Sequence, residues 1–234
     1  VRNTLRKMIE QAEKAEPRTA WIKRIQELVQ TWKESVSDKV NSDIEPILPE
    51  RLCRELTDYL PSDAILVSDT GHSGVWTGTM IDLKHPDQTF IRCAGSLGWG
   101  LPAAMGAKCA QPDRPVLLFT GDGGIWYHLA DLETAMKYGI NTVTLVNNNH
   151  SLNQEKGGVE DIYGGQTAGS DDLWLFPDAD FAKIAESIGC LGITVNKPSE
   201  LASALDQAFA AGKPVVVDVK THLDGIAPSA WAPE

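Results

Sequence analysis

The chain has 234 residues, with 21 Lys or Arg against 32 Asp or Glu and a formal net charge of −11. This length is enough for one large α/β domain with a buried core. The negative net charge argues against nucleic acid as a partner, because a protein that binds a phosphate backbone needs a basic face. No apolar run reaches about 18 residues, so we expect neither a membrane span nor an export signal.

Residues 1–45 are expected to be a helical lead-in followed by a linker. Apolar residues recur at helical spacing in two stretches, and Pro17 lies between them, where it can begin the second helix. Residues 1–40 carry nine Lys or Arg and six Asp or Glu, so their charge is opposite to that of the remainder. We assign residues 46–220 to the main domain and residues 221–234 to a C-terminal tail.

From residue 50 onward, apolar strand-like segments alternate with helical patterns. The expected strands are 64–67, 89–91, 116–119, 142–146, 192–195 and 214–219. The expected helices are 50–60, 75–83, 101–110, 129–138 closed by Gly139, 179–188, and 200–211 capped by Ser199. This alternation predicts an α/β fold, a doubly wound and mostly parallel sheet of about six strands with helices on both faces.

Residues 153–170 show no clear period and carry five glycines, so we expect a long loop. It either orders over a bound ligand or is a plain surface loop in its far half. Elsewhere the cysteines form no C-x-x-C pair, which disfavours a metal cluster or a disulfide framework and fits a reducing, cytoplasmic setting. For Cys93 we favour a buried structural thiol over a reactive one.

Polar clusters end two consecutive predicted strands. Asp122 lies in the turn Gly121-Asp122-Gly123-Gly124, and Asn149 ends the run Asn147-Asn148-Asn149. Because both lie at the carboxyl ends of parallel strands, we expect them to meet at a ligand site. A carboxylate and an amide oxygen suit Mg²⁺ or Ca²⁺, and two protein oxygens leave room for phosphate ligands.

The glycines of this turn allow backbone N–H groups to approach a phosphate closely. No Lys or Arg lies between Pro115 and Met136. The negative charge of a phosphate here must therefore be balanced by a metal, by backbone N–H groups and by a helix N-terminus. The pattern predicts a site for a metal-bridged diphosphate.

Gly-Asp-Gly followed about 27 residues later by Asn-Asn resembles the signature of thiamine-diphosphate enzymes, most closely the acetolactate synthase-like branch. That branch also holds pyruvate oxidases and 2-oxo-acid decarboxylases. The resemblance implies that Asp122, Asn149 and the backbone carbonyl of Ser151 bind Mg²⁺. The third asparagine blurs the register, and the spacing together with Leu152 favours Asn149 over Asn148. The neighbouring cofactor residues implied are Gly121, Gly123, Gly124, Leu152 and Asn153. Leu152, Asn153 and Gln154 are also candidates to face the substrate, because they lie close to the metal turn.

Two more stretches fit the same family, and the resemblance covers roughly residues 46–220. Residues 68–76 resemble its first diphosphate-binding turn, which implies that Gly71, His72 and Ser73 touch the diphosphate. Residues 95–104 resemble the segment that holds the aminopyrimidine ring. There the Gly95 carbonyl would accept from the 4′-amino group, with Ser96 beside it, and Leu97 would lie under the bent cofactor. Gly95 and Leu97 are therefore the catalytic candidates.

The resemblance implies thiamine-diphosphate- and Mg²⁺-dependent cleavage or formation of a C–C bond on a 2-oxo acid such as pyruvate, by a carboligase or a decarboxylase. This chain would supply the diphosphate and metal half of the site. In relatives a glutamate comes from a pyrimidine-binding domain, normally on a neighbouring subunit, and we find no such stretch here. We therefore expect a homodimer or homotetramer, a lead-in that ends a preceding central domain, and no turnover by this chain alone. Whether FAD binds stays open, since flavin lies largely in the central domain.

Two other classes remain open. A nicotinamide-dependent dehydrogenase would need G-x-G-x-x-G, whereas Gly95 to Gly100 reads G-x-x-G-x-G. It would also leave Asp122 and Asn149 unexplained. A non-catalytic module that binds the cofactor, or only holds an assembly together, is the second alternative.

Overall fold

The computed structural model describes residues 1–12, 16–93, 95–164 and 169–228. They fall into two compact units, Val1–Ser37 and the part from Asp38 onward. The described residues of the first unit form helices α1 (Arg2–Gln11) and α2 (Thr19–Ser35), neither of which buries a residue. Helix α2 has Arg18 as its N-cap, so Pro17 precedes this helix and does not begin it. Residues 229–234 of the predicted tail lie outside the described residues.

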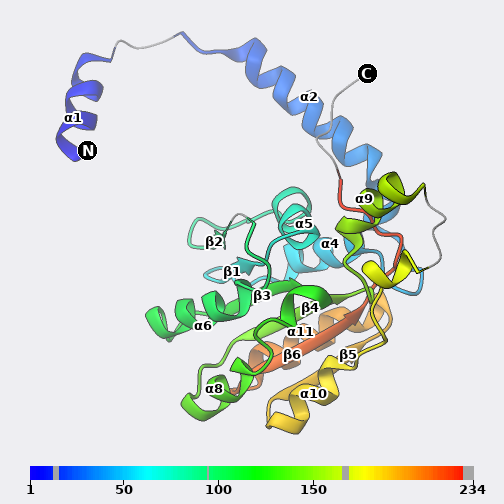
Figure 1. The fold of residues 1–234 in the computed structure, drawn as a ribbon. Coiled ribbons are helices and arrows are strands. Elements are labelled where there is room, and N and C mark those ends of the chain that lie inside the picture. Colours follow the sequence, from blue (N-terminus) through cyan, green and yellow to red (C-terminus); the bar gives the residue numbers. More distant parts are fainter. Residues whose placement is uncertain (13–15, 94, 165–168, 229–234) are drawn as a thin grey trace. The chain divides into compact units, whose positions relative to one another are not determined.

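The second unit is built on a parallel β-sheet (Figure 1). Its described residues form six strands in the order β2-β1-β3-β4-β6-β5, and every pairing between neighbours is parallel. The predicted doubly wound α/β fold is thus confirmed, with a sheet that is wholly parallel in the described part of the chain. The strands are β1 (Ile65–Ser68), β2 (Thr89–Arg92), β3 (Val116–Gly121), β4 (Val143–Asn148), β5 (Leu191–Val195) and β6 (Val215–Lys220).

Helices cover both faces of this sheet (Figure 1). One face carries α4 (Pro49–Tyr59), α5 (His72–Met80) and α11 (Leu201–Ala210). The opposite face carries α6 (Gly100–Ala110), α8 (Asp131–Tyr138) and α10 (Phe181–Ile188). Shorter elements are α3 (Ser37–Val40), α7 (Asp122–Ile125), η1 (Asp171–Leu173) and η2 (Pro198–Glu200).

The two hydrophobic cores divide between alternate residues of each strand, as the pleat of a strand requires. In β3, Leu117 and Phe119 belong to the core beneath α4, α5 and α11. Val116 and Leu118 belong to the core beneath α6, α8 and α10. Because the sheet is covered on both faces, β3 is a continuous apolar run, and that run is what makes the strand visible in the sequence.

The chain changes direction across the sheet at β1 and β3. After β1 it moves outward to β2, and it then returns to place β3 on the other side of β1. Helix α5 leads from β1 to β2 on one face, whereas α8 leads from β3 to β4 on the opposite face and in the opposite direction along the sheet. The connections therefore diverge at the carboxyl ends of β1 and β3, which is where doubly wound sheets bind ligands.

Among the predicted helix ends, the limits of one helix and one cap are wrong, and one closing glycine is confirmed. Helix α5 begins at His72 and ends at Met80, whereas 75–83 was expected, because Gly71 at φ 70° turns the chain directly from β1 into the helix. The predicted Ser199 cap is wrong, because Ser199 lies inside η2 and makes no capping hydrogen bond. The Glu200 carboxylate instead accepts from the backbone N–H groups of Asn196 and Lys197. The closure of α8 by Gly139, at φ 64°, is confirmed.

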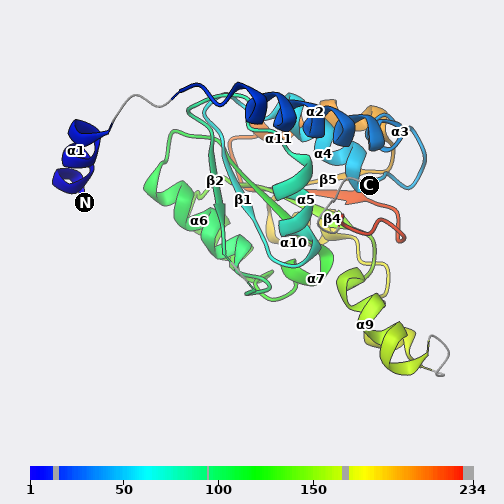
Figure 2. The ribbon, with the colours of Figure 1, turned by 90° about the horizontal axis from the view of Figure 1, so that it is seen from above.

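Helix α9 (Asn153–Tyr163) occupies most of the stretch expected to be a loop, so that prediction is wrong for residues 153–163. The helix projects from the body of the second unit (Figure 2) and ends at Gly164, at φ 63°. Within this fully described helix only Asn153 is buried, so no apolar face gives the sequence a helical period. Residues 165–168 of the predicted loop lie outside the described residues.

All four cysteines lie in described parts of the chain and are free thiols. Cys53 and Cys190 are buried, and burial raises the pKa of both thiols above its ordinary value. Cys93 is half-buried, so the expectation of a buried structural thiol is wrong at that position.

Candidate functional site

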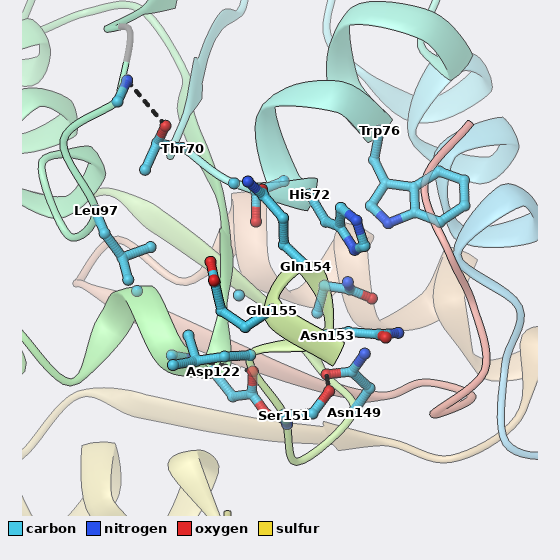
Figure 3. A pocket seen from close by; sticks show the side chains of 18 residues that line it. Thr70, His72, Trp76, Leu97, Asp122, Asn149, Ser151, Asn153, Gln154 and Glu155 are labelled. Carbon is cyan, nitrogen blue, oxygen red and sulfur yellow. Dashed lines mark hydrogen bonds between the residues drawn. The ribbon is translucent and has the colours of Figure 1, made fainter. Parts of the chain in front are cut away.

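A cavity of about 270 Å³ opens at the carboxyl ends of β1, β3 and β4 (Figure 3). It coincides with the point where the connections from β1 and β3 diverge, so its place follows from the strand order. Its walls are the turns after β1 and β3, residues 95 and 97 after β2, and the end of β4 with the first residues of α9. The lining residues are Thr70, Gly71, His72, Ser73, Trp76, Gly95, Leu97, Gly121, Asp122, Gly123, Gly124, Asn147, Asn149, Ser151, Leu152, Asn153, Gln154 and Glu155.

All of the residues predicted to bind the cofactor line this cavity except Ser96. The backbone carbonyl of Ser96 instead faces the Cys93 thiol, with 3.7 Å between oxygen and sulfur. The fold thus brings together four segments that are up to about 80 positions apart in the chain, namely residues 71–73, 95–97, 121–124 and 149–153. The role of each residue toward a cofactor stays a prediction.

Asp122 provides a buried carboxylate at the first position of α7, with 3% of its surface exposed. The backbone N–H of Gly123 donates to Oδ1 at 2.9 Å, and the backbone N–H of Ser151 donates to Oδ2 at 2.8 Å. Burial raises the pKa of Asp122 to about 7, although these backbone N–H groups act in the opposite direction. Among the described residues no Lys or Arg forms an ion pair with this carboxylate, so no side-chain cation balances its charge when it is ionised.

The three consecutive asparagines point in different directions. Asn148 donates through Nδ2 to the Asp218 carboxylate at 2.8 Å and to the Ala179 carbonyl at 3.1 Å, and it does not line the cavity. Asn147 and Asn149 both line the cavity. This alternation follows from the strand, whose successive side chains point to opposite faces. The geometry therefore favours Asn149 over Asn148 as a ligand residue.

Ser151 joins the turn after β3 to the turn after β4 (Figure 3). Its backbone N–H donates to Asp122, and its hydroxyl donates to Asn149 Oδ1 at 2.9 Å. Both oxygen-bearing side chains thus converge on one residue, as the strand ends predicted. His150, which lies between Asn149 and Ser151 in the chain, adopts φ 59°. This left-handed conformation is one that non-glycine residues seldom take, and it bends the chain between the two residues.

Glycines let the backbone of the turn after β3 pack closely against its neighbours. A Cβ atom at Gly123 would lie 2.5 Å from Leu152 Cδ2, and one at Gly124 would lie 2.7 Å from Thr120 Oγ1. Neither position has room for a side chain, so only glycine lets the backbone of this turn lie so close to Leu152 and Thr120. The predicted role of these glycines in close backbone approach therefore has a steric basis.

His72 occupies the first position of α5 and faces the cavity (Figure 3). Its Nδ1 atom is buried and has no hydrogen-bond partner among the described residues. Burial lowers the pKa of His72, while the charge of nearby Glu155 acts to raise it. A neutral imidazole with an unused ring nitrogen can donate to a ligand oxygen at this position.

Several lining residues were not predicted as site residues. Thr70 and Trp76 belong to residues 68–76, which resemble the family's first diphosphate-binding turn, but the resemblance assigned no role to either residue. Asn147 has a buried Oδ1 without a partner among the described residues, and only the strand register reveals that it faces the cavity. Gln154 was a substrate-facing candidate, and Glu155 was missed because residues 153–163 were expected to be a loop.

The donor set fits Mg²⁺ better than a softer metal. Among the described residues there is no group of three or more His, Cys, Asp or Glu that could hold a metal alone. The groups that meet at Ser151 are instead one carboxylate and one amide side chain, and carboxylate and amide oxygens are donors that Mg²⁺ accepts. The Ser151 carbonyl stays a predicted third ligand. The cavity also offers glycine-lined room beside them for phosphate oxygens, and these complete the coordination of Mg²⁺ in many proteins.

Fold and site together define a class, namely an α/β domain with an oxygen-donor ligand site at the switch point of its parallel sheet. Residues 69–219 match the family model described as "Thiamine pyrophosphate enzyme, C-terminal TPP binding domain". The chain belongs to this family of thiamine pyrophosphate enzymes, of which it has the C-terminal cofactor-binding domain.

Named relatives support this membership. The acetolactate synthase large subunit of Haemophilus influenzae is 34% identical over 194 residues, which cover 82% of this chain and 33% of that protein. The acetolactate synthase large subunit of Buchnera aphidicola subsp. Schlechtendalia chinensis is 32% identical over 205 residues, covering 86% of this chain and 34% of that protein. The chain thus spans about a third of the length of the curated relatives it matches.

A solved structure shows the same relationship. The thiamine diphosphate-dependent 4-hydroxybenzoylformate decarboxylase of Rhodococcus jostii RHA1 superposes with a TM-score of 0.68 at 32% identity. The match covers 76% of this chain and 33% of that one. Separately, none of the helices in the described part of the chain is both long and apolar enough to traverse a bilayer.

Proposed function

We propose that this chain supplies the diphosphate and metal half of an active site that cleaves or forms a C–C bond of a 2-oxo acid such as pyruvate, using thiamine diphosphate and Mg²⁺. Family membership supports the cofactor, and relatives named as acetolactate synthases and a decarboxylase support the reaction class. The observation that carries the proposal is the convergence of Asp122 and Asn149 on Ser151 beside a glycine-lined turn. Family membership also argues against the nicotinamide alternative.

The metal end is formed by Asp122, Asn149 and the Ser151 carbonyl. These groups hold Mg²⁺, and diphosphate oxygens and water complete its coordination. No Lys or Arg lines the cavity within the described residues, so the metal supplies the positive charge that both Asp122 and the diphosphate need. The first residues of α5, His72 and Ser73, and the backbone N–H of Gly124 bind the remaining diphosphate oxygens. The backbone N–H of Gly123 already donates to Asp122, so Gly123 contributes close backbone approach.

The other end of the cavity orients the reactive part of the cofactor. The Gly95 carbonyl accepts a hydrogen bond from the aminopyrimidine, and Leu97 supports the bent cofactor from below. When bound, thiamine diphosphate would supply the carbon nucleophile for chemistry at the keto carbon of a 2-oxo acid. Leu97 and Leu152 give that region apolar walls, which limit the access of water.

The proposed site is completed by a second domain. A pyrimidine-binding domain with its glutamate, from a neighbouring copy in a homodimer or homotetramer, closes the cavity and protonates the aminopyrimidine. The chain's match to about a third of its relatives supports a division of the site between domains. The 2-oxo acid then binds between the two halves, close to the first residues of α9.

The test is a calorimetric titration of the chain with thiamine diphosphate, with and without Mg²⁺. We expect saturable binding that requires Mg²⁺ and that is lost in Asp122→Ala. The matched control is Asp131→Ala, which removes an aspartate that is half-exposed at the start of α8 and pairs with His128. Equal binding with and without Mg²⁺, or equal binding by wild type and Asp122→Ala, would contradict the proposal.

The half-site role has its own test. The 234-residue chain alone should not turn over pyruvate, and adding a separately produced pyrimidine-binding domain from a relative should give activity. Turnover by the chain alone would refute the proposed division of the site.

A further inference from the structure

Asp69 is a second buried carboxylate in this region, and it is not one of the predicted cofactor or metal ligands. It follows the last residue of β1 and has 1% of its surface exposed. Its Oδ1 accepts from the backbone N–H of Thr70 at 2.7 Å and of Gly98 at 2.9 Å. Its Oδ2 accepts from the backbone N–H of Gly100 at 3.3 Å and from the Thr120 hydroxyl at 3.1 Å. It does not line the cavity, so it is not placed to touch a ligand there.

Thr70, the next residue, binds the beginning of the segment 95–100, whose later residues Gly98 and Gly100 bind Asp69. The Thr70 hydroxyl accepts a hydrogen bond from the backbone N–H of Gly95 at 3.1 Å. Asp69 and Thr70 together therefore bind three backbone N–H groups of residues 95–100, which have few hydrogen bonds of their own. Gly95 at φ 81° and Gly98 at φ 87° adopt left-handed conformations in this segment, and the three hydrogen bonds to Asp69 and Thr70 hold it against β1.

The Asp69 carboxylate also reaches the strand that leads to Asp122. Thr120 lies two residues before Asp122, and the backbone N–H of Asp69 donates to the Phe119 carbonyl at 2.9 Å. The packing leaves no slack, because a Cβ atom at Gly100 would lie 2.9 Å from Asp69 Oδ2 and one at Gly124 would lie 3.0 Å from it. One side chain thus joins the segment that carries Gly95 to the turn that carries Asp122.

We propose that Asp69 and Thr70 are positioning residues that set the separation between the Gly95 carbonyl and the Asp122 metal turn. Asp69 fixes both segments to one carboxylate, and Thr70 sets the orientation of the Gly95 peptide. The inference rests on the proposed function, in which Gly95 binds the aminopyrimidine of thiamine diphosphate and the Asp122 turn binds its diphosphate. Neither residue takes part in the chemistry.

A purely structural role makes a different prediction from a positioning role. Loss of a general structural contact would weaken every ligand of the cavity alike and would lower the melting temperature in proportion. Loss of positioning would affect only a ligand that spans both ends. Magnesium pyrophosphate occupies the metal end alone, whereas magnesium thiamine diphosphate needs both, so the ratio of their dissociation constants reports the spacing.

The decisive variant is Thr70→Val, which keeps the shape of the side chain but removes the acceptor for Gly95 N–H. Its matched control is Thr70→Ser, which keeps the hydroxyl. Calorimetry on the full chain should show that Thr70→Val weakens magnesium thiamine diphosphate by about tenfold, as expected for one lost hydrogen bond, and changes magnesium pyrophosphate by less than about twofold. Thr70→Ser should resemble wild type for both ligands.

Amide hydrogen exchange gives a readout that needs no ligand. In Thr70→Val the Gly95 amide should exchange faster, while amides in β3 keep their wild-type rates. Asp69→Asn extends the test, because the NH₂ group that replaces one carboxylate oxygen cannot accept a hydrogen bond. It should free the Gly98 amide if it takes the place of Oδ1, or the Gly100 amide if it takes the place of Oδ2, and it should again weaken the binding of magnesium thiamine diphosphate alone. Should Asp69→Asn fail to fold, Thr70→Val still decides the question.

The outcomes separate the two proposals. If wild type binds neither ligand in the presence of Mg²⁺, the proposed function falls and the positioning role falls with it. If wild type binds both ligands equally, or if Thr70→Val weakens both by the same factor, the proposed function stands and the positioning role is overturned. Unchanged exchange of Gly95 in Thr70→Val would also overturn it.

Discussion

The metal-free chain should lose stability as the pH rises, and Asp122→Asn should remove that loss. Burial raises the pKa of the Asp122 carboxyl from its ordinary 3.8 to about 7. The folded state therefore holds this proton more tightly than the unfolded state does. For a raised pKa, the stabilisation is fully present below pH 3.8 and disappears as the pH rises through 7.

The size of the effect follows from that shift. Each pKa unit corresponds to about 1.4 kcal/mol, so the free energy of unfolding should fall by about 2.5 kcal/mol between pH 5 and pH 8. Asp122→Asn has no proton to lose, so its free energy of unfolding should lack this component. The lowered pKa of His72 gives an opposite trend at acid pH, but it is common to both proteins and cancels in their difference.

The assay is urea unfolding in EDTA at pH 5, 6, 7 and 8, with wild type and Asp122→Asn measured side by side. The free energy of unfolding of wild type, minus that of Asp122→Asn, should fall by about 2.5 kcal/mol from pH 5 to pH 8. Asp122→Asn should also fail to gain stability from Mg²⁺ and thiamine diphosphate at pH 8. If the two free energies of unfolding ran parallel across the whole range, burial would not destabilise the ionised carboxylate of Asp122, and its pKa would not be raised.

Three further outcomes follow from the same geometry. The affinity for Mg²⁺ should fall about tenfold per pH unit below pH 7, because metal and proton compete for Asp122; a flat profile from pH 5 to 7 in a titration would contradict this. Asn149→Ala should weaken Mg²⁺ at least about tenfold, whereas Asn148→Ala should leave Mg²⁺ binding intact and cost about 1–3 kcal/mol in urea unfolding, and the reverse pattern would assign the ligand to Asn148. Gly124→Ala should destabilise by about 1–3 kcal/mol through overpacking, whereas Gly106→Ala, which meets no atom within 4 Å, should be neutral or stabilising in the same thermal scan.

The sheet was predictable because burial on both faces makes its strands continuous apolar runs, as in Val116–Phe119. The metal turn was predictable because Asp122 and Asn149 end consecutive strands of one βαβ unit, so chain order alone brings them to the same edge. In both cases local sequence and topology carry the information.

The rest depends on contacts that leave no local pattern. Helix α9 buries only Asn153, so its sequence has no apolar period to reveal it. Two of the groups that donate to Asp69 are backbone N–H groups 29 and 31 residues away, and backbone groups carry no sequence signature. Asn147 faces the cavity only because of the strand register, which the run of three asparagines obscures.

The most direct test of the account is a crystal structure of the chain with thiamine diphosphate and Mn²⁺ in place of Mg²⁺, with the anomalous signal locating the metal. We predict one metal peak at bonding distance from the Asp122 carboxylate, the Asn149 side-chain oxygen and the Ser151 carbonyl, with two phosphate oxygens completing its shell. A peak elsewhere, or cofactor bound with Asp122 and Asn149 unligated, would contradict the central claim.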